Sequence, residues 1–251
     1  MTAPGLPIHG ADGYGAAFRA MHGSDLMRSL WAKAMGEQYP AEVEPFSSCS
    51  WWLLGRLVTE LRLRPDAMLV DLGCGRGGPG LWLARAFSAR LTSIDFSPAA
   101  VELARSRAAA FVEPSSATFQ VGTFDATGLP DGVADGVVSM DGLIFAEDRP
   151  AAVREVHRVL APGGRAAFTA GQKHPWREYI VEAGLRFEQQ IPNPYHREHW
   201  QRIYALWTAH ADGLRRELGD AVTDGLLNEA ATVDELETAE AFLFVASRPT
   251  E

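Results

Sequence analysis

The 251-residue chain has little of what several classes of protein need. It contains two cysteines, Cys49 and Cys74, which are too few for a disulfide framework or a metal cage. No segment approaches the ~20 consecutive apolar residues of a membrane-spanning helix. The first residues also lack the basic start and apolar run of a secretory signal. These absences predict a cytoplasmic protein with no membrane span.

The chain also has no excess of positive charge. Its 23 Lys and Arg residues are outnumbered by 32 Asp and Glu residues, which gives a formal net charge of -9. Proteins that bind a nucleic-acid backbone usually present a basic face, so no nucleic-acid partner is expected. Apolar residues make up 47% of the chain, enough for a full core, and the length suits one α/β domain with a subsidiary cap.

From residue 64 onwards, short apolar runs alternate with helical patterns. This alternation predicts a parallel sheet with helices on both faces, and right-handed crossovers make it doubly wound. Ligands of such sheets bind beyond the carboxyl ends of the strands, where Asp71, Asp95 and Met140–Asp141 lie. Strands are expected at residues 68–71, 90–95, 118–121, 136–140, 165–169, 185–190 and 241–247, and helices at 79–87, 98–111, 150–160 and 176–183.

Further helical patterns lie on either side of this core. Apolar residues recur at three- and four-residue spacings, which is typical of amphipathic helices. Such helices are expected at residues 21–35, 45–63, 197–218 and 221–240. We therefore predict a single domain with four parts: a helical lid at 1–63, a cofactor-binding core at 64–192, a helical cap inserted at 193–240, and a last strand and tail at 241–251.

The most informative segment is residues 69–80, which read LVDLGCGRGGPG. An apolar strand ends at Asp71, and a glycine-rich turn leads into the next helix. The glycines permit positive φ and let a ligand approach the backbone closely. The spacing Gly73-x-Gly75-x-x-Gly78 also fits a dinucleotide site, so the glycines alone do not identify the cofactor.

Acidic residues at successive strand ends narrow the choice. At Asp71, a carboxylate would repel a diphosphate and favour a ligand with an ammonium or sulfonium cation, although it could also accept hydrogen bonds from the turn itself. Asp95 lies 20 residues after Gly75, where an acid accepts hydrogen bonds from ribose hydroxyls. Asp125 can accept from an adenine amino group while Phe124 packs on the ring.

In order and spacing, these motifs resemble the class I S-adenosylmethionine-dependent methyltransferase family. Residues 71–77 match its acid-x-glycine-x-glycine-x-glycine motif, and residues 94–97 resemble its second motif. Residues 122–126 are similar to its adenine loop, although that loop more often reads Gly-Asp-Ala. Residues 160–165 resemble the turn that enters strand five. The resemblance covers about residues 45–169 and the last strand, and it points to the bacterial small-molecule branch.

The resemblance implies a Rossmann-like sheet of seven strands in the order 3-2-1-4-5-7-6, with the seventh antiparallel. It also implies S-adenosylmethionine as the methyl donor and S-adenosylhomocysteine as the product. The acceptor would be a small molecule, methylated on oxygen, nitrogen or carbon. The residues expected to bind the donor are Asp71, Gly73, Cys74, Gly75, Asp95, Phe96, Phe124, Asp125 and Met140.

Methyl transfer from a sulfonium needs in-line placement of the acceptor and exclusion of water rather than a metal. The pair His196 and His199 has helical spacing, but one pair is too little for a zinc site. For an oxygen acceptor, the expected general base is first His174, after strand five, and then Asp141, after strand four. Asp141 could instead only orient the methionine part of the donor, and His174 could only pack.

Aromatic residues gather in the lid and the cap. They favour an apolar or aromatic acceptor, although helical spacing also suits the cap's own core. The lid residues expected to close over the donor are Tyr14, Phe18, Trp31, Trp51 and Trp52, and the cap adds Tyr195, Trp200, Tyr204 and Trp207.

Three other functions remain for the same sequence. The scaffold could bind S-adenosylmethionine yet serve cyclisation or other non-methylating chemistry. A nicotinamide-dependent oxidoreductase is disfavoured by Asp71 and by the Phe124–Asp125 pair. A non-enzymatic binding module is disfavoured because the set of cofactor residues is complete. Either a monomer or a homodimer is compatible with the sequence.

Overall fold

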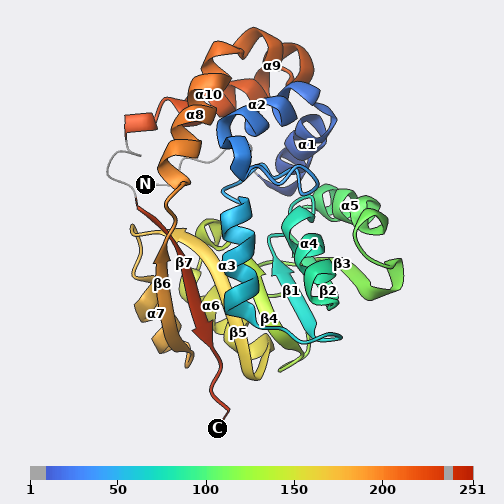
Figure 1. Cartoon of the computed structure of the whole chain (residues 1–251), viewed down its shortest axis with the longest axis vertical. Helices are drawn as coiled ribbons and strands as arrows, with labels where there is room; N and C mark the ends of the chain where they lie inside the picture. The colour runs from blue at the N-terminus through green and yellow to red at the C-terminus, as the bar shows by residue number, and fades with distance from the viewer. Residues whose placement is uncertain (1–9, 235–239, 251) are drawn as a thin grey trace.

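A seven-stranded mixed sheet forms the centre of the molecule (Figure 1). The computed structural model describes residues 10–234 and 240–250. The strand order is β3-β2-β1-β4-β5-β7-β6, and β7 runs antiparallel to the other six strands. The predicted order and the predicted direction of the last strand are confirmed. The strands are β1 Met68–Leu72, β2 Arg90–Asp95, β3 Ala117–Val121, β4 Ala134–Ser139, β5 Leu160–Gly171, β6 Arg186–Pro192 and β7 Ala241–Ser247.

Five helices cover the two faces of the sheet. Helices α3, α4 and α5 pack into one apolar cluster, and α6 and α7 pack into another on the opposite face. Ser97 and Asp148 cap α5 and α6, because their side chains accept hydrogen bonds from the amides of Ala100 and Ala151. The helices are α3 Trp51–Leu61, α4 Gly78–Phe87, α5 Pro98–Arg107, α6 Arg149–Val159 and α7 Trp176–Glu182.

A layer of five more helices lies above the carboxyl ends of the central strands (Figure 1). The lid helices and the cap helices share one apolar cluster, which includes Leu30, Trp31, Ile203 and Trp207. The lid and the cap therefore pack against each other as one roof over the sheet. These helices are α1 Gly10–Gly23, α2 Asp25–Met35, α8 His196–Ala209, α9 Ala211–Leu218 and α10 Asp220–Ala230. None of the helices described is long and apolar enough to cross a membrane.

The helix α1 was not predicted, because four glycines make its sequence a poor helix. Tertiary packing overrides this weak propensity. A side-chain carbon at Gly15 would lie 2.8 Å from Ala99 Cβ and 2.9 Å from Ser97 Oγ. Gly15 therefore lets the lid approach the start of α5 at the rim of the sheet, next to Asp95.

Several predicted boundaries were wrong for local reasons. The helix expected at 21–35 is two helices, because Ser24 leaves the helical conformation and its Oγ accepts from the amide of Met27. The helix expected at 45–63 begins only at Trp51, after the cap Ser50. Strand β5 begins at Leu160 rather than 165, because Leu160 already pairs with Ala134.

The cap also differs from the sequence prediction. The helix expected at 197–218 breaks at His210, whose φ of -114° leaves the helical range. The helix expected at 221–240 ends at Ala230, and residues 235–239 of that prediction lie outside the described residues. The break at His210 lets α9 turn back towards α1 and α2.

Candidate functional site

The glycine-rich turn after β1 is held by the neighbouring strand. The amides of Gly73 and Cys74 donate to the Ile94 carbonyl at 2.8 and 3.0 Å. Gly73 and Gly75 have φ of 72° and 51°, which favours glycine. A side-chain carbon at Gly73 would lie 3.0 Å from the Phe124 ring, so the backbone passes directly beneath that ring.

Asp71 is a buried carboxyl group directly before this turn. It is 2% exposed, and its Oδ2 has no hydrogen-bond partner among the described residues. Burial, and then the negative charge of Asp95, raise the pKa of Asp71 to about 7, while the Gly80 amide opposes this rise. A buried carboxylate with one unpaired oxygen is costly, so a nearby ligand cation would stabilise it.

Asp95 links the turn to the following helix. Its Oδ2 accepts from the Gly75 amide and its Oδ1 from the Ser97 amide, both at 2.9 Å. The turn amide therefore bonds to Asp95 rather than to Asp71. Each carboxylate oxygen keeps a further lone pair for a ligand. Phe96 is 37% exposed, and its ring packs 5.3 Å from that of Tyr14 in the lid.

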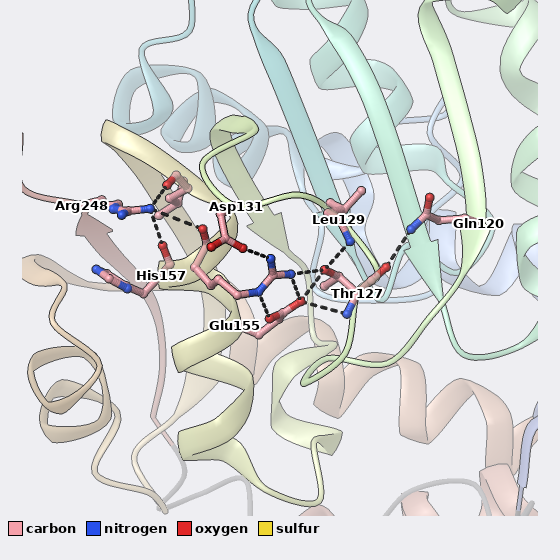
Figure 2. Close-up of polar contacts among 9 residues, drawn as sticks. Gln120, Thr127, Leu129, Asp131, Glu155, His157 and Arg248 are labelled. Carbon is pink, nitrogen blue, oxygen red and sulfur yellow. Dashed lines mark hydrogen bonds and ion pairs between the residues drawn. The ribbon is translucent and has the colours of Figure 1, made fainter.

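The loop that carries Phe124 and Asp125 is anchored from behind by α6. Figure 2 shows the Glu155 carboxylate accepting from both the amide and the hydroxyl of Thr127. Arg158 donates to the same carboxylate from Nε and Nη2, both at 2.7 Å. Arg158 also pairs with Asp131, at the far end of the same loop. This network fixes the loop, and through it Phe124, over the glycine-rich turn.

Glu155 gives the fold a defined pH dependence. Burial alone would raise the pKa of Glu155, but hydrogen bonds from Arg158 and Thr127 lower it to about 2. An acid whose pKa is lowered by folding stabilises the fold at pH values above its unfolded-state pKa, here near 4.5. This stabilisation is lost as pH falls through the folded-state pKa of about 2. We expect Glu155→Gln to lower the free energy of unfolding by about 2 kcal/mol at pH 6. Urea denaturation at pH 6 and near pH 2 should show that this difference in stability disappears at the lower pH. A difference that stays constant would contradict a lowered pKa at Glu155.

A cavity of about 1120 Å³ connects the turn to the helical roof. All the predicted donor residues line it, as do Asp141 and His174. Tyr14, Phe18 and Trp31 line it from the lid, as predicted. Trp51 and Trp52 do not: Trp51 packs on Trp82 and Trp52 on Tyr195, so the expectation that they close over the donor was wrong. From the cap, the cavity wall includes Trp200, Tyr204 and Trp207 but not Tyr195.

Asp141 lies at the end of β4 with both carboxylate oxygens engaged. Thr169 Oγ1 donates to Oδ1 at 2.6 Å, and the Ser48 amide donates to Oδ2 at 2.7 Å. Its φ of 52° lies in the left-handed region, a strained conformation for a non-glycine residue. Asp141 therefore connects the loop before α3 to the carboxyl ends of the central strands β4 and β5.

The two histidines of the cavity wall have different surroundings. His174 lies near Arg149 and Lys173; burial, and then these two positive charges, lower its pKa. His196, at the start of α8, places Nδ1 3.2 Å from Ser48 Oγ, which also accepts from Trp200 Nε1 at 3.1 Å. Burial lowers the pKa of His196, and the Asp141 carboxylate opposes this effect.

The roof contributes a further carboxyl group, Glu229 on α10. Tyr204 donates its hydroxyl to Glu229 Oε1 at 3.0 Å. Burial raises the pKa of Glu229 to about 7, and the charge of Asp141 adds to this while Tyr204 opposes it. Burial, then the charges of Asp95, Glu229 and Asp141, also raise the pKa of Tyr14 to about 12. Tyr14, Asp95, Asp141 and Glu229 all line the same cavity.

The sequence did not point to Ser48, Thr169, His196 or Glu229 as site residues. They come from four segments that only the fold brings together, and none belongs to a glycine or acid motif. The one signal was the pair His196 and His199, which was considered only for zinc. Within the described residues, no group of three or more His, Cys, Asp or Glu side chains could hold a metal ion.

Comparison with known proteins places this geometry in a family. Residues 70–168, which run from β1 into β5, match the family model of a methyltransferase domain. These residues form a methyltransferase domain of the class I S-adenosylmethionine-dependent type. The cofactor of this family is S-adenosylmethionine. The family model covers the glycine-rich turn, the Asp95 site and the Phe124–Asp125 loop, but not the helical roof.

Curated relatives of this methyltransferase-family chain act on unrelated small molecules. It is 32% identical over 145 residues to the 27-O-demethylrifamycin SV methyltransferase of Amycolatopsis mediterranei (strain S699), covering 57% of this chain and 53% of that one. It is 36% identical over 126 residues to the chloroplastic tocopherol O-methyltransferase of Arabidopsis thaliana, covering 45% and 36%. The chain thus spans about half the length, or less, of these curated relatives.

Solved structures share the fold at low sequence identity. The cyclase SpnF superposes with a TM-score of 0.77 at 20% identity, covering 98% of this chain and 100% of that chain. The geranyl diphosphate C-methyltransferase of Streptomyces coelicolor A3(2) superposes with a TM-score of 0.61 at 18% identity, covering 78% of each chain. The likeness to SpnF extends over the helical roof as well as the sheet.

Proposed function

We propose that this protein transfers the methyl group of S-adenosylmethionine to a small apolar or aromatic metabolite, without a metal. The observation that carries the proposal is the single cavity that joins the glycine-rich turn to an aromatic chamber in the roof. The names of the bacterial relative and of the tocopherol O-methyltransferase support a small acceptor. When bound, the cofactor supplies a methyl group already activated on a sulfonium.

The donor end of the cavity fits this cofactor. The unpaired carboxylate oxygen of Asp71 suits a cationic ligand, and the remaining lone pairs of Asp95 suit ribose hydroxyls. Phe124 would pack on the adenine ring, with Asp125 accepting from its amino group. The turn itself, from Gly73 to Gly75, would let the methionine part lie against the backbone.

The charge of the cavity as a whole suits a neutral or cationic acceptor. Nine carboxyl-bearing side chains line the cavity, against four Arg and Lys side chains. Two of those four, Arg76 and Arg107, lie within ion-pair distance of Glu44. An anionic acceptor would therefore meet an unfavourable potential, whereas an aromatic body would contact Trp200 and Tyr204.

Because the pKa of Asp71 is raised, we expect donor binding to release protons. With a pKa of about 7, Asp71 is about half protonated at neutral pH, and a ligand cation favours its ionised form. We therefore expect affinity for S-adenosylmethionine to rise between pH 6 and pH 8, with about half a proton released at pH 7. Calorimetry in buffers of different ionisation enthalpy measures this release.

Two variants assign the released proton. Asp71→Asn should abolish the release, whereas Glu229→Gln, which removes the other carboxyl group of similar pKa, should preserve it. Release that persists in Asp71→Asn would show that another group holds the proton.

A screen for S-adenosylhomocysteine tests the reaction itself. The protein is incubated with S-adenosylmethionine and a library of aromatic and apolar metabolites, and product release is followed by mass spectrometry. We expect S-adenosylhomocysteine in equal amount to a product heavier by one methyl group. Conversion of a library member without S-adenosylhomocysteine would instead support cyclisation, the second candidate, which the full-length likeness to the SpnF fold keeps in view.

A further inference from the structure

Three segments meet at one wall of the cavity, where the acceptor end adjoins the donor end. The loop before α3 contributes Ser48, the end of β4 contributes Asp141, and the start of α8 contributes His196. Ser48 bridges the other two, since its amide donates to Asp141 Oδ2 and its hydroxyl contacts His196 Nδ1. Through Ser48, the position of His196 on the roof helix α8 is fixed relative to Asp141 after β4.

The contact with Ser48 involves Nδ1 of His196 and leaves Nε2 as the nitrogen available to a substrate. Ser48 Oγ accepts from Trp200 Nε1, an indole nitrogen that can only donate. A hydroxyl has two lone pairs and one hydrogen, so Ser48 Oγ can accept from His196 Nδ1 or donate to it. We take the first arrangement, with the imidazole hydrogen on Nδ1. In that arrangement Nε2 carries the free lone pair, which is the form of imidazole that can accept a proton.

The surrounding charges favour His196 over His174 as a proton acceptor. A base that accepts a proton becomes an imidazolium cation. His196 faces the carboxylate of Asp141, which stabilises that cation, whereas His174 faces the positive charges of Arg149 and Lys173. His199, one turn along α8, is a further titratable neighbour of His196, and its ring stacks on Tyr195.

Asp141 is better placed to support His196 than to act itself. Both of its oxygens are already engaged, by the Ser48 amide and by the Thr169 hydroxyl. These bonds fix the carboxylate, whose negative charge acts on the imidazole of His196. The order of bases expected from the sequence, His174 and then Asp141, therefore changes.

Resting on the proposed methyl transfer, we propose that His196 is the general base for a hydroxyl acceptor and that Ser48 is its positioning residue. The acceptor oxygen forms a bond to the methyl carbon as the carbon–sulfur bond breaks and its electron pair goes to sulfur. His196 Nε2 takes the hydroxyl proton and later releases it to water. The acceptor class is thus an alcohol or phenol.

The test follows the histidine rings by NMR in the full chain, labelled with ¹⁵N-histidine and saturated with S-adenosylhomocysteine. His196→Gln and His174→Gln assign the two ring signals. We expect a neutral His196 at pH 7 with hydrogen on Nδ1 and a lone pair on Nε2. Ser48→Ala should mix the two tautomers, and Asp141→Asn should lower the pKa of His196 further; His174→Gln should leave its ring signals unchanged.

Several results would overturn the proposal. A His196 that is protonated at pH 7, or that carries its hydrogen on Nε2, would remove the base. An unchanged tautomer in Ser48→Ala would remove the positioning role. Calorimetry of S-adenosylhomocysteine binding on the same samples keeps these failures distinct from failure of the proposed function.

Activity gives an independent measurement with any hydroxyl acceptor that the product screen yields. His196→Gln should lower kcat by 10²- to 10⁴-fold and remove the acidic limb of its pH profile, with the KM for S-adenosylmethionine unchanged. His174→Gln should stay within about threefold of the wild type in kcat. A larger loss in His174→Gln than in His196→Gln would restore the order of bases expected from the sequence.

Discussion

Replacing Asp95 by asparagine is expected to weaken S-adenosylmethionine binding by about 10- to 100-fold. The carboxylate accepts the Gly75 amide on one oxygen and the Ser97 amide on the other. In the variant an NH₂ group must replace one oxygen, so one amide loses its acceptor and the ribose loses lone pairs. Titration calorimetry at pH 7.5 measures the change.

Asp135 offers a matched control for this variant. Its Oδ2 also accepts a backbone amide, from Met68 at 2.7 Å, but it lies exposed at the opposite end of β1. Asp135→Asn should therefore leave the affinity within about twofold of the wild type. If Asp95→Asn kept both a wild-type melting temperature and a wild-type affinity, the ribose would bind elsewhere.

Alanine substitutions at two helical glycines are expected to change the free energy of unfolding in opposite directions. A side-chain carbon at Gly80 in α4 would lie 2.3 Å from Asp71 Oδ2, far inside van der Waals contact. Gly80→Ala must displace either the helix or the buried carboxylate, and we expect a loss of about 2–4 kcal/mol in the free energy of unfolding. Gly55 in α3 meets no atom within 4 Å, so Gly55→Ala should gain about 0.5–1 kcal/mol.

Urea denaturation of the two variants measures both effects against the wild type. The comparison removes the general preference of helices for alanine, because both glycines lie inside helices. A Gly80→Ala variant as stable as Gly55→Ala would show that α4 does not pack against Asp71. The account of the buried carboxylate, and of its proton release, would then fail.

The sheet could be predicted from the sequence because its information is local. Most strands contain a short apolar run, and the helices α5 and α6 each begin with a capping side chain, Ser97 and Asp148. The order of the strands came from the family resemblance, which covered this region. The donor end of the cavity was predicted for the same reason, since its glycines and acids follow successive strands.

The acceptor end could not be predicted in this way. The apolar faces of α2 and α8 each indicate burial, but no pattern within either helix identifies the other as its partner. The contact between Ser48 and His196 joins positions 148 residues apart. Trp51 and Trp52 were misplaced because a stripe of aromatic residues does not tell which ones face a cavity.

Calorimetry with S-adenosylmethionine and with NADH distinguishes the two cofactors, because both ligands would occupy the glycine-rich turn. We predict that S-adenosylmethionine binds at one site per chain, with Asp95→Asn weakening it, and that NADH gives no heat of binding. Binding of NADH without binding of S-adenosylmethionine would contradict the account.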